Sequence, residues 1–269
     1  ATALAGDLAQ TNAPAINATA NILSYMTVSA KLSIETSATQ SSLIGYEADQ
    51  YHQTSWGLEY NLGQINYGQN RDFVFRITEP VGNTPSITAR VSYLDNTGDR
   101  FDVVQDNVEW EGTREITLPS DDPSWNAFNR LIFVEKINQA INLLKIATTE
   151  TLDNANSVIA RYENDLDNSA YVPEMLTSKF ILAIHEDLVG QVLPALSKKE
   201  WWNRWGRHYL PSIAGAYQSQ VCNNFMDKGV QFFGGELFKT IQSKLEELFI
   251  KIPMDPGYLS GRYINTGGS

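Results

Sequence analysis

Between residues 27 and 119, hydrophobic and polar residues alternate in several short runs. The clearest are Val28–Ile34, Phe73–Ile77 and Ile87–Tyr93, and turn-forming residues such as Asp95–Gly98 separate them. Side chains two positions apart lie on one face of a strand, so this alternation is typical of half-buried strands. Short strands at this spacing predict an antiparallel β-sandwich over residues 27–119.

The most strongly patterned part of this region runs from Trp56 to Ile77. Glycines at positions 57, 63 and 68 punctuate it, and glycine permits a positive φ or a bulge. We expect a strand that includes Leu62–Ile65, a tight turn, and a second strand at Tyr67–Gln69.

After Ser120 the apolar residues recur every three or four positions, which is the period of an α-helix. Asp121–Pro123 is a helix start signal, since Asp is favoured at the cap and Pro at the first helical position. Ser197 and Glu200 have the spacing of a capping box for a later, aromatic helix. We predict helices over 123–149, 150–166 and 173–196, an aromatic helix that begins after Ser197, and a closing helix over 236–250. Together they predict an α-helical bundle over residues 120–252.

The two ends of the chain have different patterns. Residues 1–26 are rich in Ala, Asn, Leu and Ile at helical spacing, and we expect a short N-terminal helix that is the remnant of, or a linker from, a preceding domain. Residues 253–269 contain prolines and late glycines and are expected to form a flexible C-terminal tail. The predicted fold is α+β and multi-domain: a short N-terminal helix, an antiparallel β-sandwich and an α-helical bundle.

The stretch Trp201–Phe238 concentrates large side chains. It holds three of the six tryptophans, the single cysteine and one of the three histidines. Aromatic side chains bury the most area per residue, so this stretch is expected to be the keystone of a helical core. A docking surface for another protein is the alternative.

Charge narrows the possible partners. The chain has a net charge of −11, which opposes binding of nucleic acid or anionic lipid through a broad electrostatic surface. No run approaches the roughly 20 apolar residues that span a bilayer, so we expect no membrane span. One cysteine excludes an internal disulfide, and this slightly favours the cytoplasm.

The motifs of the common catalytic and metal sites are absent from the sequence. There is no phosphate-binding loop, dinucleotide fingerprint, Gly-x-Ser-x-Gly elbow, His-Glu-x-x-His or Cys-x-x-Cys. His185–Asp187 places three polar groups in a row, but consecutive residues of a helix point in different directions. We therefore expect no metal and no cofactor.

Cys222 and His208 invite a cysteine-nucleophile hypothesis, because a thiolate needs a nearby base. Fourteen residues separate them, which is about 21 Å of helical rise. The two could meet only if the helix breaks between them, for example near Gly215. A lone cysteine among aromatic residues is more often a small buried hydrophobe.

Several motifs resemble one family. They are Trp202–Ser212, Gln220–Phe225, Asp227–Gln231 and the Gly234–Gly235 pair, together with Leu62–Asp72 in the β region. They closely resemble the Vwaint region of von Willebrand factor A proteins associated with hedgehog/intein-like (Hint) domains. The resemblance covers most of residues 27–252 and implies that residues 1–26 are the last helix of an A-type domain.

Two departures limit what the resemblance implies. The Asp-x-Ser-x-Ser motif of cation-dependent adhesion is absent, and so is the Hint domain itself. Hint domains open with a cysteine that attacks the preceding carbonyl. One hypothesis is therefore that Gly267, Gly268 and Ser269 form the processed end of a self-cleaving precursor. The alternative is that Ser269 marks a boundary without biological meaning.

We expect a non-catalytic protein-interaction or scaffold module whose partner is another protein or an adjacent A-type domain. The alternatives are the N-terminal product of a Hint precursor and a hydrolase or transferase that uses Cys222 and His208. Arg204 and Arg207 are a docking pair or stack on neighbouring tryptophans. The residues expected to bind a partner are Trp201, Trp202, Arg204, Trp205, Arg207, His208, Tyr209, Asn223 and Asn224.

Overall fold

The computed structural model describes residues 8–38, 40–78, 86–95, 97–105, 123–167, 178–222 and 227–251. Antiparallel sheets occupy the N-terminal part and helices follow, so the predicted α+β class is confirmed. The predicted strands between residues 106 and 119, and the predicted tail at 253–269, lie outside the described residues. The proposed domain boundaries stay predictions.

The larger sheet has five antiparallel strands in the order β3-β4-β1-β6-β7. In that order, the strands are β3 (His52–Thr54), β4 (Gly57–Asn66), β1 (Tyr25–Thr36), β6 (Ile87–Leu94) and β7 (Arg100–Gln105). The long central strand β1 pairs Leu32 with Tyr60 on one side and with Val91 on the other. The alternation of Val28–Ile34 therefore predicted the central strand of the sheet.

A second, two-stranded sheet pairs β2 (Gln40–Leu43) with β5 (Phe75–Thr78). Leu43 from β2 and Phe75 from β5 pack into the same apolar cluster as Leu32, Ile34 and Leu58 of the larger sheet. The two sheets thus share one core, as the strands of a sandwich do.

The segment after β4 differs from its prediction. Residues 67–74 form a turn and then an extended segment, and no strand forms at Tyr67–Gln69. Gly63, which was expected near the end of the first strand, lies inside β4 with a φ of 63°. The register of β4 against β1 shifts next to it. The Asp72 backbone contacts the helical part: its N–H donates to Gln220 and its carbonyl oxygen accepts from Arg130. At the two ends of the segment, the Tyr67 N–H donates to Ser24 and the Val74 carbonyl oxygen accepts from Ile44.

The helical part contains a bundle whose first members are α2 (Pro123–Leu143) and α3 (Thr149–Asp167). Helix α4 (Lys179–Asp187) continues through a π-helical turn at Leu188–Val192 into α5 (Leu193–Ser197). After α6 (Lys199–Trp201) and a second π-helical turn (Trp202–Gly206) come α7 (Arg207–Ser219) and a 3-10 turn at Val230–Phe233. The last helix is α8 (Glu236–Lys251), and the first helix of the chain is α1 (Leu8–Leu23).

The predicted capping box before the aromatic helix is wrong. The N-cap of α6 is Lys198, which makes no side-chain cap hydrogen bond. The Ser197 hydroxyl instead donates to the carbonyl oxygen of Pro194, 2.9 Å away, because Ser197 is the last residue of α5. The spacing of a capping box was present, but Ser197 belongs to the preceding helix.

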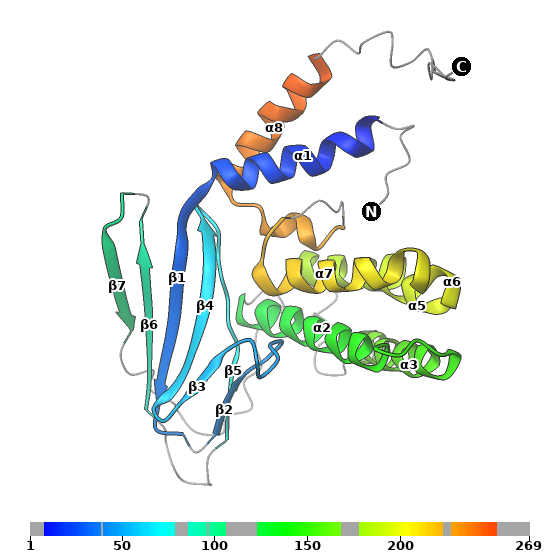
Figure 1. The fold of residues 1–269 in the computed structure, drawn as a ribbon, viewed down its shortest axis with the longest axis horizontal. Helices are drawn as coiled ribbons and strands as arrows, with labels where there is room; N and C mark the ends of the chain where they lie inside the picture. Colours follow the sequence, from blue (N-terminus) through cyan, green and yellow to red (C-terminus); the bar gives the residue numbers. More distant parts are fainter. Residues whose placement is uncertain are drawn as a thin grey trace, which may run out of the picture.

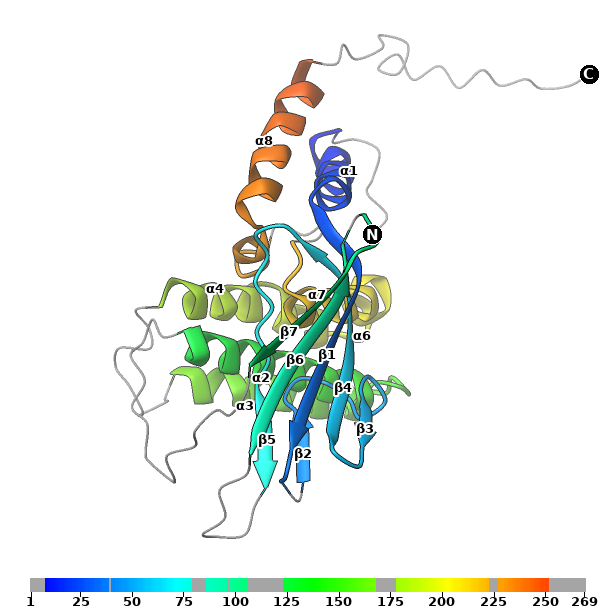
Figure 2. The ribbon, with the colours of Figure 1, turned by 90° about the vertical axis from the view of Figure 1, so that its left-hand side faces the viewer.

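Figure 1 shows the helices α2, α3, α5, α6 and α7 extending away from one face of the larger sheet. The helices α1 and α8 pack together above this layer in both views (Figures 1 and 2). The Gln242 amide of α8 donates to Asn17 Oδ1 of α1 across 2.8 Å. The N-terminal helix therefore packs against the last described helix of the chain.

One helical rod, Lys179–Ser197, is long and apolar enough to cross a membrane by length and composition alone. No such segment was expected from the sequence. One face of the rod packs inside the bundle, where Ile184, Leu188 and Val192 are fully buried. Leu182 and Val189 of the same rod are exposed, so core burial accounts for part of its apolar composition.

Candidate functional site

A buried carboxylate, Asp187, organises the aromatic half of the bundle. It lies at the end of α4 and is 3% exposed. The Tyr217 hydroxyl of α7 donates to Asp187 Oδ2, and the backbone N–H groups of Lys228 and Gly229 donate to its two oxygens across 2.7 and 2.9 Å. Next to it, the Tyr209 hydroxyl donates to Asp227 Oδ1 across 2.6 Å. These bonds hold the Asp227–Gly229 turn against α4 and α7.

The pKa of Asp187 is raised to about 6, chiefly because burial disfavours the ionised carboxylate, while the three hydrogen bonds act in the opposite direction. Burial also raises the pKa of Asp227. The pKa values of Tyr209 and Tyr217 lie far above their usual range, first through burial and then through the neighbouring carboxylates. Both tyrosines are therefore hydrogen-bond donors at all physiological pH values.

Gly229 is required by this packing. A Cβ atom built at this position would collide with the Tyr217 hydroxyl and lie 3.0 Å from Asp187 Oδ2. Only glycine allows the backbone to approach the buried carboxylate this closely. The Asp-Lys-Gly sequence at 227–229 thus has a structural explanation.

The C-terminal end of α7 is capped by residues from outside that helix. The last carbonyl groups of a helix lack partners within it. Arg130, from α2, donates through Nη1 to the carbonyl oxygens of Tyr217 and Gln218, and through Nη2 to the carbonyl oxygen of Asp72. A cation at a helix C-terminus is also favoured by the helix dipole. Arg130 thus joins α2 and α7 to the part of the chain that holds strands β1 to β7, which we call the β domain.

Side chains of the β domain complete this cap. The Gln69 amide donates to the carbonyl oxygens of Ser219 and Gln220 across 3.1 and 2.7 Å. The Gln220 amide donates to Asp72 Oδ2 across 2.7 Å, and its oxygen accepts from the Asp72 backbone N–H across 2.6 Å. Gln220 itself ends α7 in the left-handed conformation, with φ 46° and ψ 46°. We call this set of contacts the joint: Gln69, Asp72, Arg130 and Gln220.

A close backbone contact lies beside the joint. A Cβ atom added to Gly235 would lie 2.7 Å from the carbonyl oxygen of Gly68. The Asn21 side chain adds a further link, because it donates to the carbonyl oxygen of Cys222 across 2.9 Å and accepts from Asn66 across 3.0 Å. The two separate sequence motifs, Leu62–Asp72 and the stretch after Trp202, therefore meet in space.

Arg130 is a buried cation whose charge is not directly paired. It is 1% exposed, and burial lowers its pKa to about 10, so that it stays charged at neutral pH. Among the described residues, its guanidinium group forms no ion pair within 4.0 Å and its Nε–H has no hydrogen-bond acceptor. The Asp72 carboxylate is the nearby charge that favours its ionised form.

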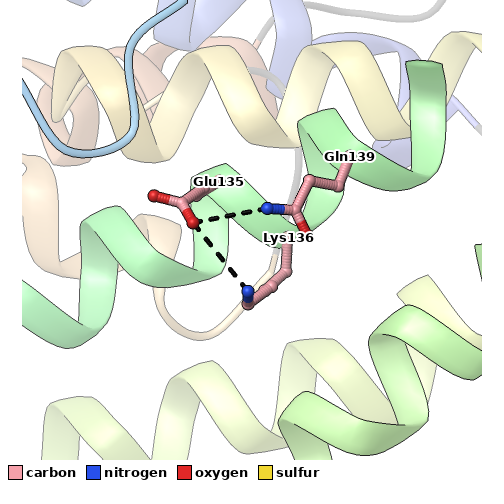
Figure 3. Close-up of polar contacts among 3 residues, drawn as sticks. All are labelled: Glu135, Lys136 and Gln139. Carbon is pink, nitrogen blue, oxygen red and sulfur yellow. Dashed lines mark hydrogen bonds and ion pairs between the residues drawn. The ribbon is translucent and has the colours of Figure 1, made fainter.

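The exposed face of α2 carries polar contacts of a different kind. There the Gln139 amide donates to Glu135 Oε1 across 3.3 Å, and Lys136 Nζ lies 3.8 Å from the same oxygen (Figure 3). All three residues belong to one helix and reach solvent. Such contacts contribute little to stability, so this face provides positions for control variants.

The residues expected to bind a partner fall into two groups. Trp202 and Tyr209 are buried in the helical core, and Trp205 is half-buried against it. Trp201, Arg204, Arg207 and His208 are exposed. Lys198 Nζ lies 5.2 Å from the centroid of the Trp201 ring, and Arg207 Nε donates to His208 Nε2 across 3.0 Å. We call these four exposed residues the ridge; Asn223 and Asn224 lie outside the described residues.

The structure does not bring Cys222 and His208 together. Helix α7 runs unbroken from Arg207 to Ser219, so His208 lies in its first turn and Cys222 beyond its last. Cys222 is 2% exposed, its Sγ contacts Gln231 Oε1 at 3.6 Å, and burial raises its pKa to about 11. A buried, protonated thiol is a poor nucleophile. The helix break near Gly215 that this hypothesis required is absent.

Two other expectations have different outcomes. Gly267, Gly268 and Ser269 lie outside the described residues. Within the ranges that the structure describes, no three His, Cys, Asp or Glu side chains gather as a metal ion would require.

The comparisons with known proteins locate one recognisable segment. Residues 178–247 match the Vwaint family model, described as VWA / Hh protein intein-like. This segment is similar to Vwaint domains. It extends from Ser178, the cap of α4, into α8, and contains the Asp187 cluster, the ridge and Gln220. No curated protein and no solved structure matches the chain.

The Vwaint segment does not include the whole joint. Arg130, Asp72 and Gln69 precede residue 178, so the β domain and α2 supply groups that cap α7, a helix inside the matched segment. Sequence reasoning missed Arg130 and Asp187 as organising residues. Little in the local sequence marks either residue, because Arg130 follows Asn129 and Asp187 follows His185 and Glu186, and charged residues among polar neighbours usually lie on a surface.

Proposed function

We propose that the chain is a non-catalytic protein-interaction or scaffold module, in which the β domain and the Vwaint segment are held in a fixed relation and the ridge binds a partner protein. The observation that carries this proposal is the division of the motif residues. Asp187, Gln220 and Gly229 are used inside the molecule, whereas Trp201, Arg204, Arg207 and His208 are exposed.

The position of the ridge suits a docking surface. It lies on α6 and the start of α7, at the end of the helical layer farthest from the sheet (Figure 1). Tryptophan and arginine are among the residues that contribute most of the binding energy in protein interfaces. Trp201, which is 40% exposed, supplies such a ring next to Arg204.

Charge identifies the class of partner. The chain carries a net charge of −11, yet residues 198–208 contain four Lys or Arg residues and only one acidic residue. A local cationic patch on an acidic protein attracts an acidic segment and repels further copies of the acidic surface. We therefore propose that the partner presents a Glu- or Asp-rich segment to the ridge.

The proposal is tested by site-specific photo-crosslinking in the natural host. A photoreactive amino acid in place of Arg204 should capture a discrete partner, and an excess of a glutamate-rich peptide should abolish the product. The same amino acid in place of Gln139, on the exposed face of α2 (Figure 3), is the positional control. Capture of the same product from both positions would contradict a specific ridge.

A charge-reversed pair makes the test quantitative. Arg204→Glu with Arg207→Glu should weaken binding of the glutamate-rich peptide by about tenfold or more, since like charges at an interface are strongly unfavourable. Arg161→Glu with Lys244→Glu changes the net charge equally at exposed positions of α3 and α8. Equal loss in both pairs would show that only the total charge matters and would contradict the proposal.

A further inference from the structure

A second surface feature, separate from the ridge, is a cleft of about 710 Å³ beside the joint. Its walls come from the Gly68–Asp72 segment of the β domain, from the first residues of α2, α4 and α8, and from Phe232–Gly235. The volume is within the range of small-molecule sites in proteins, which is about 300–1,000 Å³.

Three helices begin at this cleft. Pro123 starts α2, Ser178 caps α4 and Glu236 starts α8, and all three residues line the cleft. These helices contain 21, 9 and 16 residues. Each N-terminus carries about half a positive charge from the aligned peptide dipoles, together with backbone N–H groups that lack partners within the helix. Three such termini facing one space create a positive potential there.

The side chains of the cleft add to this potential. Arg130, Lys179 and Lys239 line it, against the carboxylates of Asp72 and Glu236, so the lining residues that the structure describes carry one excess positive charge. Arg130 is almost completely buried, and its Nε–H lacks a hydrogen-bond acceptor in the described part of the chain. The Nε atom itself is not accessible to solvent, but the guanidinium charge has no ion-pair partner within 4.0 Å among the described residues. A carboxylate in the cleft would partly compensate this buried charge.

One wall of the cleft is aromatic. Phe180 of α4 makes edge-to-face contacts with Phe232 and Phe233, with ring centroids 5.3 and 5.8 Å apart. All three rings line the cleft, and Phe232 is 49% exposed. An exposed phenylalanine beside a polar recess offers a contact for an apolar group of a ligand.

We propose that this cleft binds a monocarboxylate that carries an adjacent apolar or aromatic group. The single excess charge suits a monoanion, and the phenylalanine wall suits the attached apolar body. Free small acids and the C-terminal end of a peptide with an apolar last residue share this chemistry. The inference does not rest on the proposed function, because the cleft and the ridge share no residue.

The test uses the full chain and three probes of similar size. N-acetyl-phenylalanine, which imitates a peptide end, should bind saturably with a Kd on the order of 1 mM, as expected for a ligand of this size. Its uncharged amide should bind about tenfold more weakly or not at all. 3-Phenylpropionate represents the free acid, and tighter binding of one of these two acids identifies the source. Ligand-observed NMR titration measures all three.

Variants at the rim make the test specific. Lys179→Glu with Lys239→Glu, both at exposed positions, should weaken binding of N-acetyl-phenylalanine by about tenfold, which corresponds to reversal of two neighbouring charges. Lys198→Glu with Arg207→Glu, beside and within the ridge, changes the net charge equally and should leave the Kd for N-acetyl-phenylalanine within about twofold of the wild-type value.

Four results would overturn the proposal. They are no saturable binding of either acid, equal binding of the amide, equal loss in both charge-reversed pairs, and tighter binding of phenyl phosphate than of either acid. The last result would show that the cleft selects a different class of anion. Failure here leaves the ridge untouched, and failure of partner capture at Arg204 leaves the cleft untouched.

Discussion

Gln220 holds Asp72 with both ends of its side-chain amide. Its nitrogen donates to the Asp72 carboxylate across 2.7 Å, and its oxygen accepts from the Asp72 backbone N–H across 2.6 Å. The two residues are separated by 148 positions and belong to the helical part and the β domain. This pair is therefore a direct link between the two halves of the molecule, made by the left-handed C-cap residue of α7.

Removing this amide should destabilise the whole chain. We expect Gln220→Ala to lower the free energy of unfolding by about 2–3 kcal/mol, because a charged acceptor and a backbone donor lose their partners together. Urea denaturation measures the change. Gln139→Ala, on the exposed face of α2 (Figure 3), should change stability by less than about 0.5 kcal/mol. Similar values for the two variants would contradict the role given to Gln220.

A matched pair of glycine variants tests the packing around Asp187. Gly229→Ala should cost about 3 kcal/mol, since its Cβ meets the Tyr217 hydroxyl and the Asp187 carboxylate. Gly215→Ala, within α7, meets nothing within 4 Å and should stabilise the chain by about 0.5–1 kcal/mol through helix propensity. Thermal unfolding distinguishes the two directly, and a Gly229→Ala variant as stable as wild type would show that the turn can move.

The guanidinium group of Arg130 should not be replaceable by an ammonium group. One of its nitrogens donates to carbonyl oxygens of α7, and another donates to the carbonyl oxygen of Asp72. Lysine has only one side-chain nitrogen, with a different geometry. We expect Arg130→Lys to cost at least about 2 kcal/mol of unfolding free energy. Arg161→Lys, at an exposed position of α3, is the control. An unchanged unfolding midpoint for Arg130→Lys would mean that a positive charge alone is sufficient to stabilise this end of α7.

The buried carboxyl of Asp187 should make stability depend on pH. Its pKa in the folded chain is about 6, above the value of about 3.9 for an unfolded chain. Its contribution to stability is therefore fully present below about pH 4 and is lost as the pH rises through 6, because the folded state then holds an ionised carboxylate in a buried place. Asp227, whose pKa is also raised, acts in the same direction.

Comparison with Asp187→Asn isolates this effect. The difference in unfolding free energy between wild type and Asp187→Asn should decrease from pH 4 to pH 7 and then level off. Urea denaturation at a series of pH values measures it, and the carboxyl resonance of Asp187 reports the pKa itself. A difference that increases with pH would show that the hydrogen bonds from Tyr217, Lys228 and Gly229 outweigh burial.

Local patterns predicted the elements well and their contacts poorly. The alternation of Ile87–Tyr93 and the helical period after Ser120 correspond to β6 and α2, because the apolar face of each element is fixed by its own sequence. The second strand expected at Tyr67–Gln69 is absent, since this segment binds the end of α7 rather than another strand. Whether this segment forms a strand therefore depends on residues about 150 positions away.

The candidate site was predicted in part. The aromatic stretch was expected to be the keystone of a helical core, with a docking surface as the alternative, and the structure divides it, with Trp202 in the core and Trp201 exposed. Burial of one ring and exposure of its neighbour follow from the turn of the helix, which the π-helical turn at Trp202–Gly206 alters locally. Arg130 could not be assigned a role, because its partners, Asp72 and the end of α7, lie 58 and 87 or 88 positions away in the sequence.

The central claim is that the joint couples the β domain to the Vwaint segment. A double-mutant cycle of Asp72→Ala and Gln220→Ala, measured by urea denaturation, tests it most directly. We expect a coupling energy of about 1–2 kcal/mol, because each single variant already breaks the hydrogen bond between the two side chains. Changes in unfolding free energy that add within about 0.5 kcal/mol would contradict the claim.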